Sequence, residues 1–534
     1  MDVNDGNGVT RRRVMQTGGA LAALLFGGGL DRALAEGLVR FGEARPFSFE
    51  GLKQTAEALA GAPYSKPLVR AADVLETIDY DAHNRIGFDP DATLWGEDPA
   101  SPAVRFFHLG RYFKNPVNVS VVGPDGSARE LLYSADLFTR PLDSPSRRLP
   151  DDIGFAGLRV MDPGQKDDWL AFLGASYWRT SGPFGQFGLS TRGLAVDTAI
   201  PNGSEEFPRF TSFWLEATGE NSLVIHALMD SESVAGAYRI ESEKREDGIV
   251  QEVEAALYMR EAVERLGIAP LTSMYWYGEN SRHLASDWRP EIHDSDGLEI
   301  WSGNGERIFR PLNNPPHVMV NSFMVTGPKG FGLMQRDRDF ENYQDDGVFY
   351  EKRASLWVEP LGDWSEGCVD LVELPTDDEI HDNIVAFWTP SEPTAPGRAM
   401  TMRYRLSWVA DNPHPAEVAT LASLRIGRGG VPGQPRPEGV AKFALDFRGE
   451  KLKRLSRESG VAAKIEASRG EIGLVSAYPV VGTDEWRLLF DLDAQGEEPV
   501  DLRVYLLHEG DALTETVLYQ FFPETFLEKM AAMP

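Results

Sequence analysis

Alternation of apolar and polar residues with a period of two is the pattern that most constrains the fold of this chain. It recurs in many short runs, for example in residues 116–122, 222–228, 400–408 and 501–507. Successive side chains of a strand point to opposite faces of a sheet, so these runs predict strands with a buried face. The 52 glycines and 35 prolines that interrupt the runs favour turns. We therefore predict an all-β chain built from sandwiches.

Helical periodicity is scarce in comparison. Residues 49–62 carry apolar side chains at helical spacing, including Leu52 and Ala56, and predict one helix. Residues 254–266 are ambiguous, because their first half continues a strand while residues 260–265 are compatible with one or two helical turns. Helices are therefore expected to be minor elements.

A segment rich in glycine and proline divides the chain unequally. Residues 411–437 contain Asp-Asn-Pro-His-Pro and Gly-Arg-Gly-Gly-Val-Pro-Gly-Gln-Pro-Arg-Pro, and this density of turn formers predicts a linker. Residues 438–534 carry at least four strand-like runs and have the size of an immunoglobulin-like sandwich. We expect a large β domain in residues 36–410 and a small one after the linker.

The first 35 residues have the features of an export signal. Residues 11–13 are arginines, a weakly apolar stretch follows, and Ala33-Leu34-Ala35 offers small residues for cleavage. This order predicts a secretory signal peptide in residues 1–35, and the paired arginines favour the twin-arginine pathway. The apolar stretch is short and rich in glycine, which argues against a membrane anchor. We expect the mature chain in the periplasm, without insertion into a membrane.

Acidic residues dominate the charge of the chain. The 82 Asp and Glu residues outnumber the 53 Lys and Arg residues and give a net charge of −29. This charge repels phosphate backbones and anionic lipids, so no nucleic-acid partner is expected. A neutral or cationic ligand is favoured.

The cysteine and histidine content argues against several kinds of metal and catalytic site. Cys368 is the only cysteine, so an intrachain disulfide and a cysteine-based metal site are excluded. Its alternating run predicts a strand in which Cys368 is a small core residue. The nine histidines form no H-E-x-x-H pattern, and the sequence has no G-x-S-x-G elbow and no P-loop. No cofactor and no metal site is expected.

Three acidic clusters that lie among aromatic residues are the candidates for catalysis. They occupy residues 291–296, 336–346 and 377–382, and eleven of the twelve tryptophans precede residue 411. Aromatic faces and polar side chains hold sugars, and hydrolysis of a glycosidic bond needs a carboxylic acid and a carboxylate. Neighbouring acids also raise the pKa of a general acid. The clusters therefore favour an enzyme that acts on carbohydrate.

Other interpretations of these clusters remain open at the level of sequence. Asp-Ser-Asp-Gly and Thr-Asp-Asp-Glu are common turn sequences in which aspartate caps its own backbone. An EF-hand calcium loop from Asp294 is excluded, because its twelfth position is Gly305. For each candidate sugar contact, burial in the core is an equal alternative. These candidates are Trp301, Arg310, Asn313, Arg336, Tyr350 and Trp357.

Longer runs of residues identify a family. From about Phe47 to the C-terminus the chain resembles the periplasmic glucan biosynthesis family, the osmoregulated proteins G and D, and the twin-arginine signal is similar to that of the D branch. The runs that carry the resemblance are Phe172–Tyr177 (FLGASY), Gly188–Ala195 (GLSTRGLA), Glu206–Phe210 (EFPRF), Leu266–Met274 (LGIAPLTSM), His293–Gly297 (HDSDG), Arg310–Pro315 (RPLNNP), Gly330–Phe340 (GFGLMQRDRDF), Ser355–Pro360 (SLWVEP) and Asp382–Trp388 (DNIVAFW).

The resemblance implies a fold, an activity and a set of site residues. It implies a large galactose-mutarotase-like β-sandwich followed by a small immunoglobulin-like one, and an inverting endo-β-1,2-glucanase. By the family pattern Asp382 is the general acid and Asp294 the general base, while Glu379 and Tyr350 are pocket residues that bind substrate. One departure is Ala354, which stands where relatives often have proline, so the loop after Tyr350 lacks a residue that fixes φ.

Two alternative functions keep the same fold. A transglycosylase would use a sugar hydroxyl as acceptor and give branched or cyclised glucan. A non-catalytic scaffold would bind nascent β-glucan and have an inner-membrane glucan synthase as its partner. Both candidate catalytic positions are aspartates, which favours the hydrolase over the scaffold.

Overall fold

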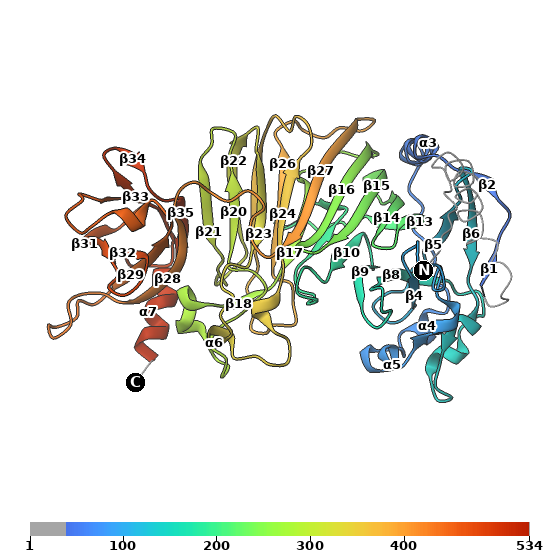
Figure 1. Ribbon diagram of the computed structural model, residues 1–534, viewed down its shortest axis with the longest axis horizontal. Coiled ribbons are helices and arrows are strands. Elements are labelled where there is room, and N and C mark those ends of the chain that lie inside the picture. The colour runs from blue at the N-terminus through green and yellow to red at the C-terminus, as the bar shows by residue number, and fades with distance from the viewer. Residues whose placement is uncertain (1–38, 533–534) are drawn as a thin grey trace, which may run out of the picture.

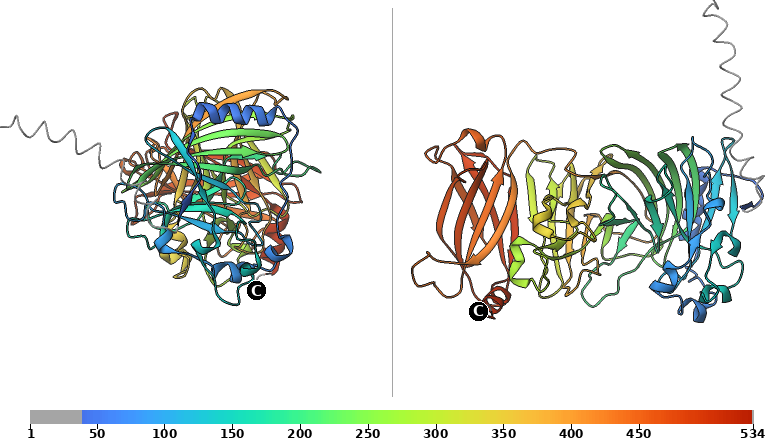
Figure 2. Two further views of the ribbon diagram at one scale, coloured as in Figure 1. Left: turned by 90° about the vertical axis from the view of Figure 1, so that its right-hand side faces the viewer. Right: turned by 60° about the horizontal axis from the view of Figure 1, so that its bottom comes forward.

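Strands dominate the architecture, as the alternating pattern predicts. The structure is a computed structural model and describes residues 39–532, so the predicted signal peptide lies outside the described residues. The molecule is a row of β layers in which the C-terminal strands lie at one end and the first described strands at the other (Figures 1 and 2). The prediction of an all-β chain is confirmed.

Two extended sheets form the large N-terminal part. In order of neighbours, the first contains β6 (Ser127–Leu132), β5 (Asn118–Val122), β13 (Arg209–Gly219), β14 (Ser222–Asp230), β15 (Val234–Arg245), β16 (Gly248–Met259), β27 (Ala399–Val409), β24 (Ser355–Pro360), β23 (Gly330–Met334), β20 (Gly297–Trp301) and β21 (Arg307–Pro311). The second contains β22 (Met319–Thr326), β25 (Glu366–Glu373), β26 (Ile384–Pro390), β17 (Leu266–Ser273), β11 (Ser190–Arg192), β10 (Tyr177–Thr180), β9 (Asp168–Leu173), β8 (Phe155–Met161) and β4 (Val104–His108), and β12 (Leu194–Val196) pairs with β17. Their facing side chains form one large hydrophobic core.

Two layers of four strands each form the C-terminal sandwich. One sheet has the order β28 (Thr420–Arg428), β29 (Val440–Arg448), β32 (Glu485–Asp493) and β31 (Glu471–Pro479). The other contains β30 (Ala462–Ala467), β33 (Val500–His508), β34 (Asp511–Ala512) and β35 (Thr516–Phe521). Strand β28 lies within the segment 411–437, so part of the predicted linker is a strand. Its side chains Leu421 and Leu424 are buried in the C-terminal core, and the register of the strand shifts between Leu421 and Ser423.

The C-terminal sandwich is continuous with the large part. Strand β35 pairs in parallel with β21, and Phe309, Met334 and Trp357 from the large part belong to the C-terminal hydrophobic core. A sheet that crosses the boundary and a shared core fix the two parts against each other.

Helices are few and short. They are α3 (Phe49–Ala60), α4 (Ala72–Leu75), α5 (Tyr80–Asn84), α6 (Phe340–Tyr343) and α7 (Pro523–Ala532). The Oγ of Ser48 accepts the N–H of Gly51 and caps α3, which buries Leu52 and Ala56 as its spacing predicts. The strand β16 ends at Met259, and the ambiguous residues 260–265 that follow it form an irregular segment and no helical turn.

Two further features bear on the predictions. Cys368 lies on β25 as expected but is only half-buried. Burial and the nearby Asp370 raise the pKa of its thiol to about 12, so the thiol stays protonated and unreactive. Within residues 39–532, no helix has both the length and the apolar character needed to cross a membrane.

Candidate active site

The two candidate catalytic carboxylates are brought together by one short stretch of backbone. Asp294 follows β19 (Ile292–His293) and its N–H donates to the carbonyl of Met274 at 2.9 Å. Asp382 precedes β26, and the side chain of its neighbour Asn383 accepts from the N–H of Tyr275 at 2.8 Å and donates to its carbonyl at 2.9 Å. Met274 and Tyr275 therefore hold both acidic segments, 88 positions apart in the chain, in one place.

Asp382 is the solvent-exposed member of the pair. It is exposed, yet surrounding protein atoms displace part of its water, and this raises its pKa. The positive charges of Arg192, Arg179 and Arg353 oppose the rise. The hydroxyl of Tyr177 lies 3.4 Å from its Oδ2. A carboxyl with a raised pKa at an accessible position suits a general acid.

A chain of hydroxyls leads to Asp382 across three neighbouring strands. Ser190 on β11 lies 2.6 Å from Thr272 on β17, and Thr272 is hydrogen-bonded to Tyr177 on β10. The ring of Tyr177 also lies 5.0 Å from the guanidinium carbon of Arg192. These contacts fix the Tyr177 hydroxyl beside Asp382.

Asp294 is the buried member of the pair. Its side chain is 10% exposed, and Nε of Arg353 lies 3.3 Å from its Oδ1. Burial raises its pKa to about 6, the charge of Asp382 raises it too, and Arg353, His293 and Arg179 oppose the rise. Asp294 therefore ionises at neutral pH while remaining a stronger base than an ordinary aspartate.

Glu379 and Tyr350 lie side by side in the same site. The hydroxyl of Tyr350 donates to Oε2 of Glu379, and Arg289 binds both oxygens of Glu379 at 2.8 and 3.1 Å. Arg289 is also bound to Asp345 at 2.7 Å. Tyr350 is buried, and burial with the adjacent Glu379 raises the pKa of its hydroxyl, so it stays a proton donor. These contacts hold Glu379 in one orientation three residues before Asp382.

Asp382 lines a cleft of about 780 Å³. Aromatic side chains line it together with Tyr177, Arg179 and Ser190, and Tyr80 and Tyr112 are 69% and 65% exposed. Arg179 lies over the ring of Phe187 at 4.9 Å. Aromatic faces with interspersed polar groups are suited to sugar rings.

Other predicted sugar contacts are buried. Arg310 is 2% exposed and binds Glu373 at 2.9 Å, while Asn313 is 4% exposed and donates to Glu373 and Gln520. Trp357 is fully buried and belongs to the C-terminal core. In this structure these three side chains support the fold and have no surface for a sugar.

Trp301 and Arg336 also lie apart from the carboxylate pair. Trp301 is half-buried between Arg307, at 3.8 Å, and Lys329, at 4.8 Å, and packs against the C-terminal core. Arg336 pairs with Glu299 and Glu515 at the domain boundary. Of the predicted site residues, the structure thus brings together Asp294, Asp382, Glu379 and Tyr350.

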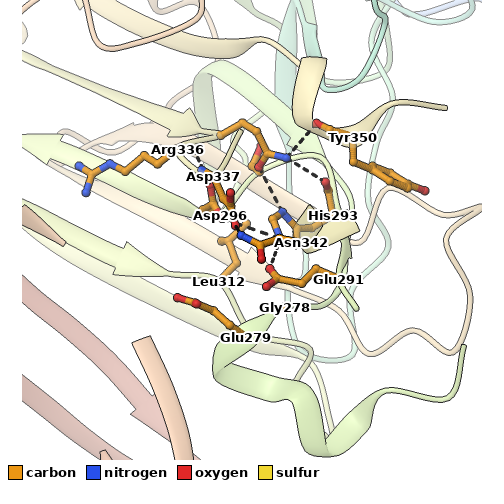
Figure 3. A network of polar contacts seen from close by, with 12 residues as sticks. Gly278, Glu279, Glu291, His293, Asp296, Leu312, Arg336, Asp337, Asn342 and Tyr350 are labelled. Atoms are coloured by element: carbon orange, nitrogen blue, oxygen red, sulfur yellow. Dashed lines mark hydrogen bonds and ion pairs between the residues drawn. The ribbon is translucent and has the colours of Figure 1, made fainter. Parts of the chain in front are cut away.

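A polar network connects this site to the domain boundary (Figure 3). Gln335 donates to the carbonyls of Tyr350 and His293 at 3.1 and 3.2 Å. The ring of His293 contacts Gln335 and Glu291, both at 3.1 Å. Glu291 and Asp296 raise the pKa of His293 to about 9 despite its burial. His293 is therefore a buried cation directly before Asp294.

Glu279 lies near this network and contacts the C-terminal sandwich. Its Oε1 accepts the N–H of Leu424 at 2.6 Å and its Oε2 lies 3.6 Å from Arg425. Burial and the charge of Glu291 raise the pKa of Glu279 to about 8. Between pH 4.5 and 8 the folded protein holds a proton that the unfolded chain releases, so stability falls as pH rises through this window.

We expect Glu279→Gln to flatten that pH dependence. At pH 8 the variant is more stable than wild type by about 2 kcal/mol, because the amide accepts the Leu424 N–H without a buried charge. At pH 4 the two proteins are equally stable. In the variant, the free energy of unfolding still decreases between pH 6.5 and 9, because the unfolded chain loses the proton of His293 before the folded protein does. Urea unfolding at several pH values measures the effect, and a variant that is less stable than wild type at pH 8 contradicts the assignment.

Several residues of the site were not singled out from sequence. Asn383, Arg289 and Arg353 fix the acidic side chains, and Tyr177 and Arg179 line the cleft. Tyr177 and Asn383 lie inside the residue runs that carry the family resemblance, which is a signal that could have found them. Among the described residues, no group of three or more His, Cys, Asp and Glu side chains is arranged to hold a metal ion.

Comparisons with known proteins show which family the chain belongs to. Residues 47–521 match the family described as periplasmic glucan biosynthesis protein, MdoG. Glucans biosynthesis protein D 2 of Ralstonia nicotianae is 47% identical over 96% of this chain and 98% of its own length. Glucans biosynthesis protein D of Stenotrophomonas maltophilia is 48% identical over 91% of this chain and 92% of its own.

Similarity to solved structures is weaker. A galactose mutarotase related enzyme from Lactobacillus acidophilus is 8% identical, matches 49% of this chain and 95% of its own, and gives a TM-score of 0.22. The family match and the relatives cover nearly the whole chain, including all four residues of the site. The chain therefore belongs to the periplasmic glucan biosynthesis protein family.

Proposed function

We propose that the protein hydrolyses β-1,2-glucan within the chain and inverts the anomeric carbon. The observation that carries the proposal is the pairing of an accessible carboxyl, Asp382, which lines an aromatic cleft, with a buried one, Asp294. The β-1,2 linkage is inferred from the resemblance of the residue runs. The glucan is the expected partner, and a membrane glucan synthase and twin-arginine export remain predictions.

The roles of the two carboxyls follow from their surroundings. The raised pKa of Asp382 favours its protonated form, which can donate to the leaving oxygen. Asp294 loses its proton above about pH 6 and accepts one from the attacking water. Glu379 and Tyr350, bound to each other and to Arg289, would orient a sugar or a water next to the pair. Inversion requires water to attack from the face opposite the leaving group.

An open cleft favours water as the acceptor. Asp382 is exposed and the cleft that it lines is large, so water has access to the site while the substrate is bound. Transglycosylation needs an acceptor sugar to exclude that water. Hydrolysis is therefore the first proposal and transglycosylation an outcome of its test.

Digestion of linear β-1,2-glucan tests the activity. We expect shorter oligosaccharides whose new reducing ends equal the number of bonds cleaved, and no products from linear β-1,3-glucan. Products without new reducing ends would replace the hydrolase with a transglycosylase. Bound but unchanged glucan would leave a binding scaffold and overturn the enzyme.

A further inference from the structure

Arg353 is a cation that contacts two residues of the site, Asp294 and Tyr350. It follows the short 3-10 helix Tyr350–Lys352 and its side chain is 15% exposed. Its Nε lies 3.3 Å from Oδ1 of Asp294, and its guanidinium carbon lies 5.3 Å from the ring centre of Tyr350. Among the described residues, neither this Nε nor Oδ1 of Asp294 has a hydrogen-bond partner. The contact is therefore purely a charge contact, and Oδ1 keeps its lone pairs for a proton.

The packing fixes this position of Arg353. A Cβ on Gly188 would lie 2.8 Å from Cδ of Arg353, and a Cβ on Gly182 would lie 2.5 Å from Cβ of Ala354. These two contacts need glycine because no side chain fits there. The backbone N–H of Arg353 donates to the carbonyl of Tyr350 at 3.1 Å. Gly182 and Gly188 therefore pack closely against Ala354 and Arg353 and leave the Arg353 side chain little room to move away.

The charge of Arg353 acts unequally on the two carboxyls. For Asp294 it is the largest charge that lowers the pKa, ahead of His293 and Arg179, while Asp382 raises it. For Asp382 it is the weakest of three arginines, after Arg192 and Arg179, and the Tyr177 hydroxyl also acts there. Loss of Arg353 would thus raise the proton affinity of Asp294 more than that of Asp382.

We propose that Arg353, held by Gly188, is a positioning residue that keeps Asp294 in its ionised form, the form a base requires. The role of Asp294 as a base rests on the proposed function. The charge contact itself does not, since it exists whether or not the protein hydrolyses glucan.

Three variants separate the charge of Arg353 from its packing. Arg353→Met removes the charge, Arg353→Lys retains it, and Gly188→Ala displaces the side chain. We expect the acidic limb of the kcat/KM profile, near pH 6 in wild type, to move up by about one pH unit or more in Arg353→Met. In the lysine variant it stays within about half a unit, and the alanine variant lies between them.

A second readout does not depend on activity. Aspartate labelled with ¹³C at its side-chain carboxyl gives the pKa of Asp294 by NMR, with the signal assigned through Asp294→Asn. We expect this pKa to rise in Arg353→Met and not in Arg353→Lys. An unchanged pKa, or an equal loss of kcat/KM at every pH, would overturn the proposal. If the pKa of Asp294 rises in Arg353→Met but the protein cleaves no glucan, the effect of Arg353 on Asp294 is upheld and the hydrolase is refuted. If Arg353→Met does not fold, the pKa of Asp294 in Gly188→Ala tests the proposal instead.

Discussion

Asp382→Asn is expected to lower kcat on linear β-1,2-glucan by about 10²–10⁴-fold, the usual contribution of a general acid. The amide has nearly the same shape as the carboxyl but no acidic proton for the leaving oxygen. Because Asp382 is exposed and lines the cleft, its replacement leaves the core and the stability of the protein unchanged. Glucan binding, measured by calorimetry, should be retained.

The chain offers a matched control for this loss. Asp377 is an exposed aspartate of the same loop, and Asp377→Asn should retain full activity. A β-1,2-linked disaccharide with a nitrophenyl leaving group needs little protonation, so Asp382→Asn should lose less activity on it than on glucan. Asp294→Asn should lose the same proportion of its activity on glucan and on the nitrophenyl substrate. An Asp382→Asn enzyme that cleaves glucan at the wild-type rate would remove Asp382 from the mechanism.

Arg336→Met should destabilise the protein by about 3–5 kcal/mol, because it leaves Glu515 buried without a cation and Glu299 with Arg307 alone, at 3.5 Å. The guanidinium of Arg336 binds Glu299 at 2.8 Å and Glu515 at 2.7 Å. The side chain of Glu515 is fully buried and also accepts the N–H of Leu421 at 2.7 Å. The three charges join the large part to the C-terminal sandwich, so urea unfolding should show the loss together with faster hydrogen exchange in β28 and β35.

Two companion variants test the cause of that loss. Arg425 is half-exposed and pairs with Asp446 at 2.9 Å, so Arg425→Met should cost about 1 kcal/mol or less. Adding Glu299→Gln and Glu515→Gln to Arg336→Met should recover part of the stability, because the unpaired charges are then removed. A loss below 1 kcal/mol in Arg336→Met would contradict the account of the boundary.

The sequence predicted the sheets better than the site. Alternation identified β27, whose burial alternates along the first half of the strand, and β14, although nearly all side chains of β14 are buried. It could not show that β28 continues the C-terminal sheet, because the neighbouring glycines and prolines mark the segment as a linker. Pairing partners depend on contacts far apart in the chain, and local pattern does not encode them.

The acidic clusters of the sequence indicated only part of the candidate site. Asp294, Asp382, Glu379 and Tyr350 meet, and they were found through the family resemblance rather than through spacing. Arg310 and Trp357 looked like sugar contacts because arginine and tryptophan serve that role, yet both are buried with partners in the core. Arg353 was not singled out, because its role follows only from the fold, which brings Gly188 against it.

The anomeric form of the first product tests the central claim most directly. ¹H NMR or polarimetry during the first minutes of digestion distinguishes the α-anomer from the β-anomer before mutarotation. Inversion of a β-1,2 bond by Asp382 and Asp294 predicts oligosaccharides that are initially α, with none formed by Asp382→Asn or Asp294→Asn. Initially β products would show retention and contradict the assignment of Asp294 as a base that activates water.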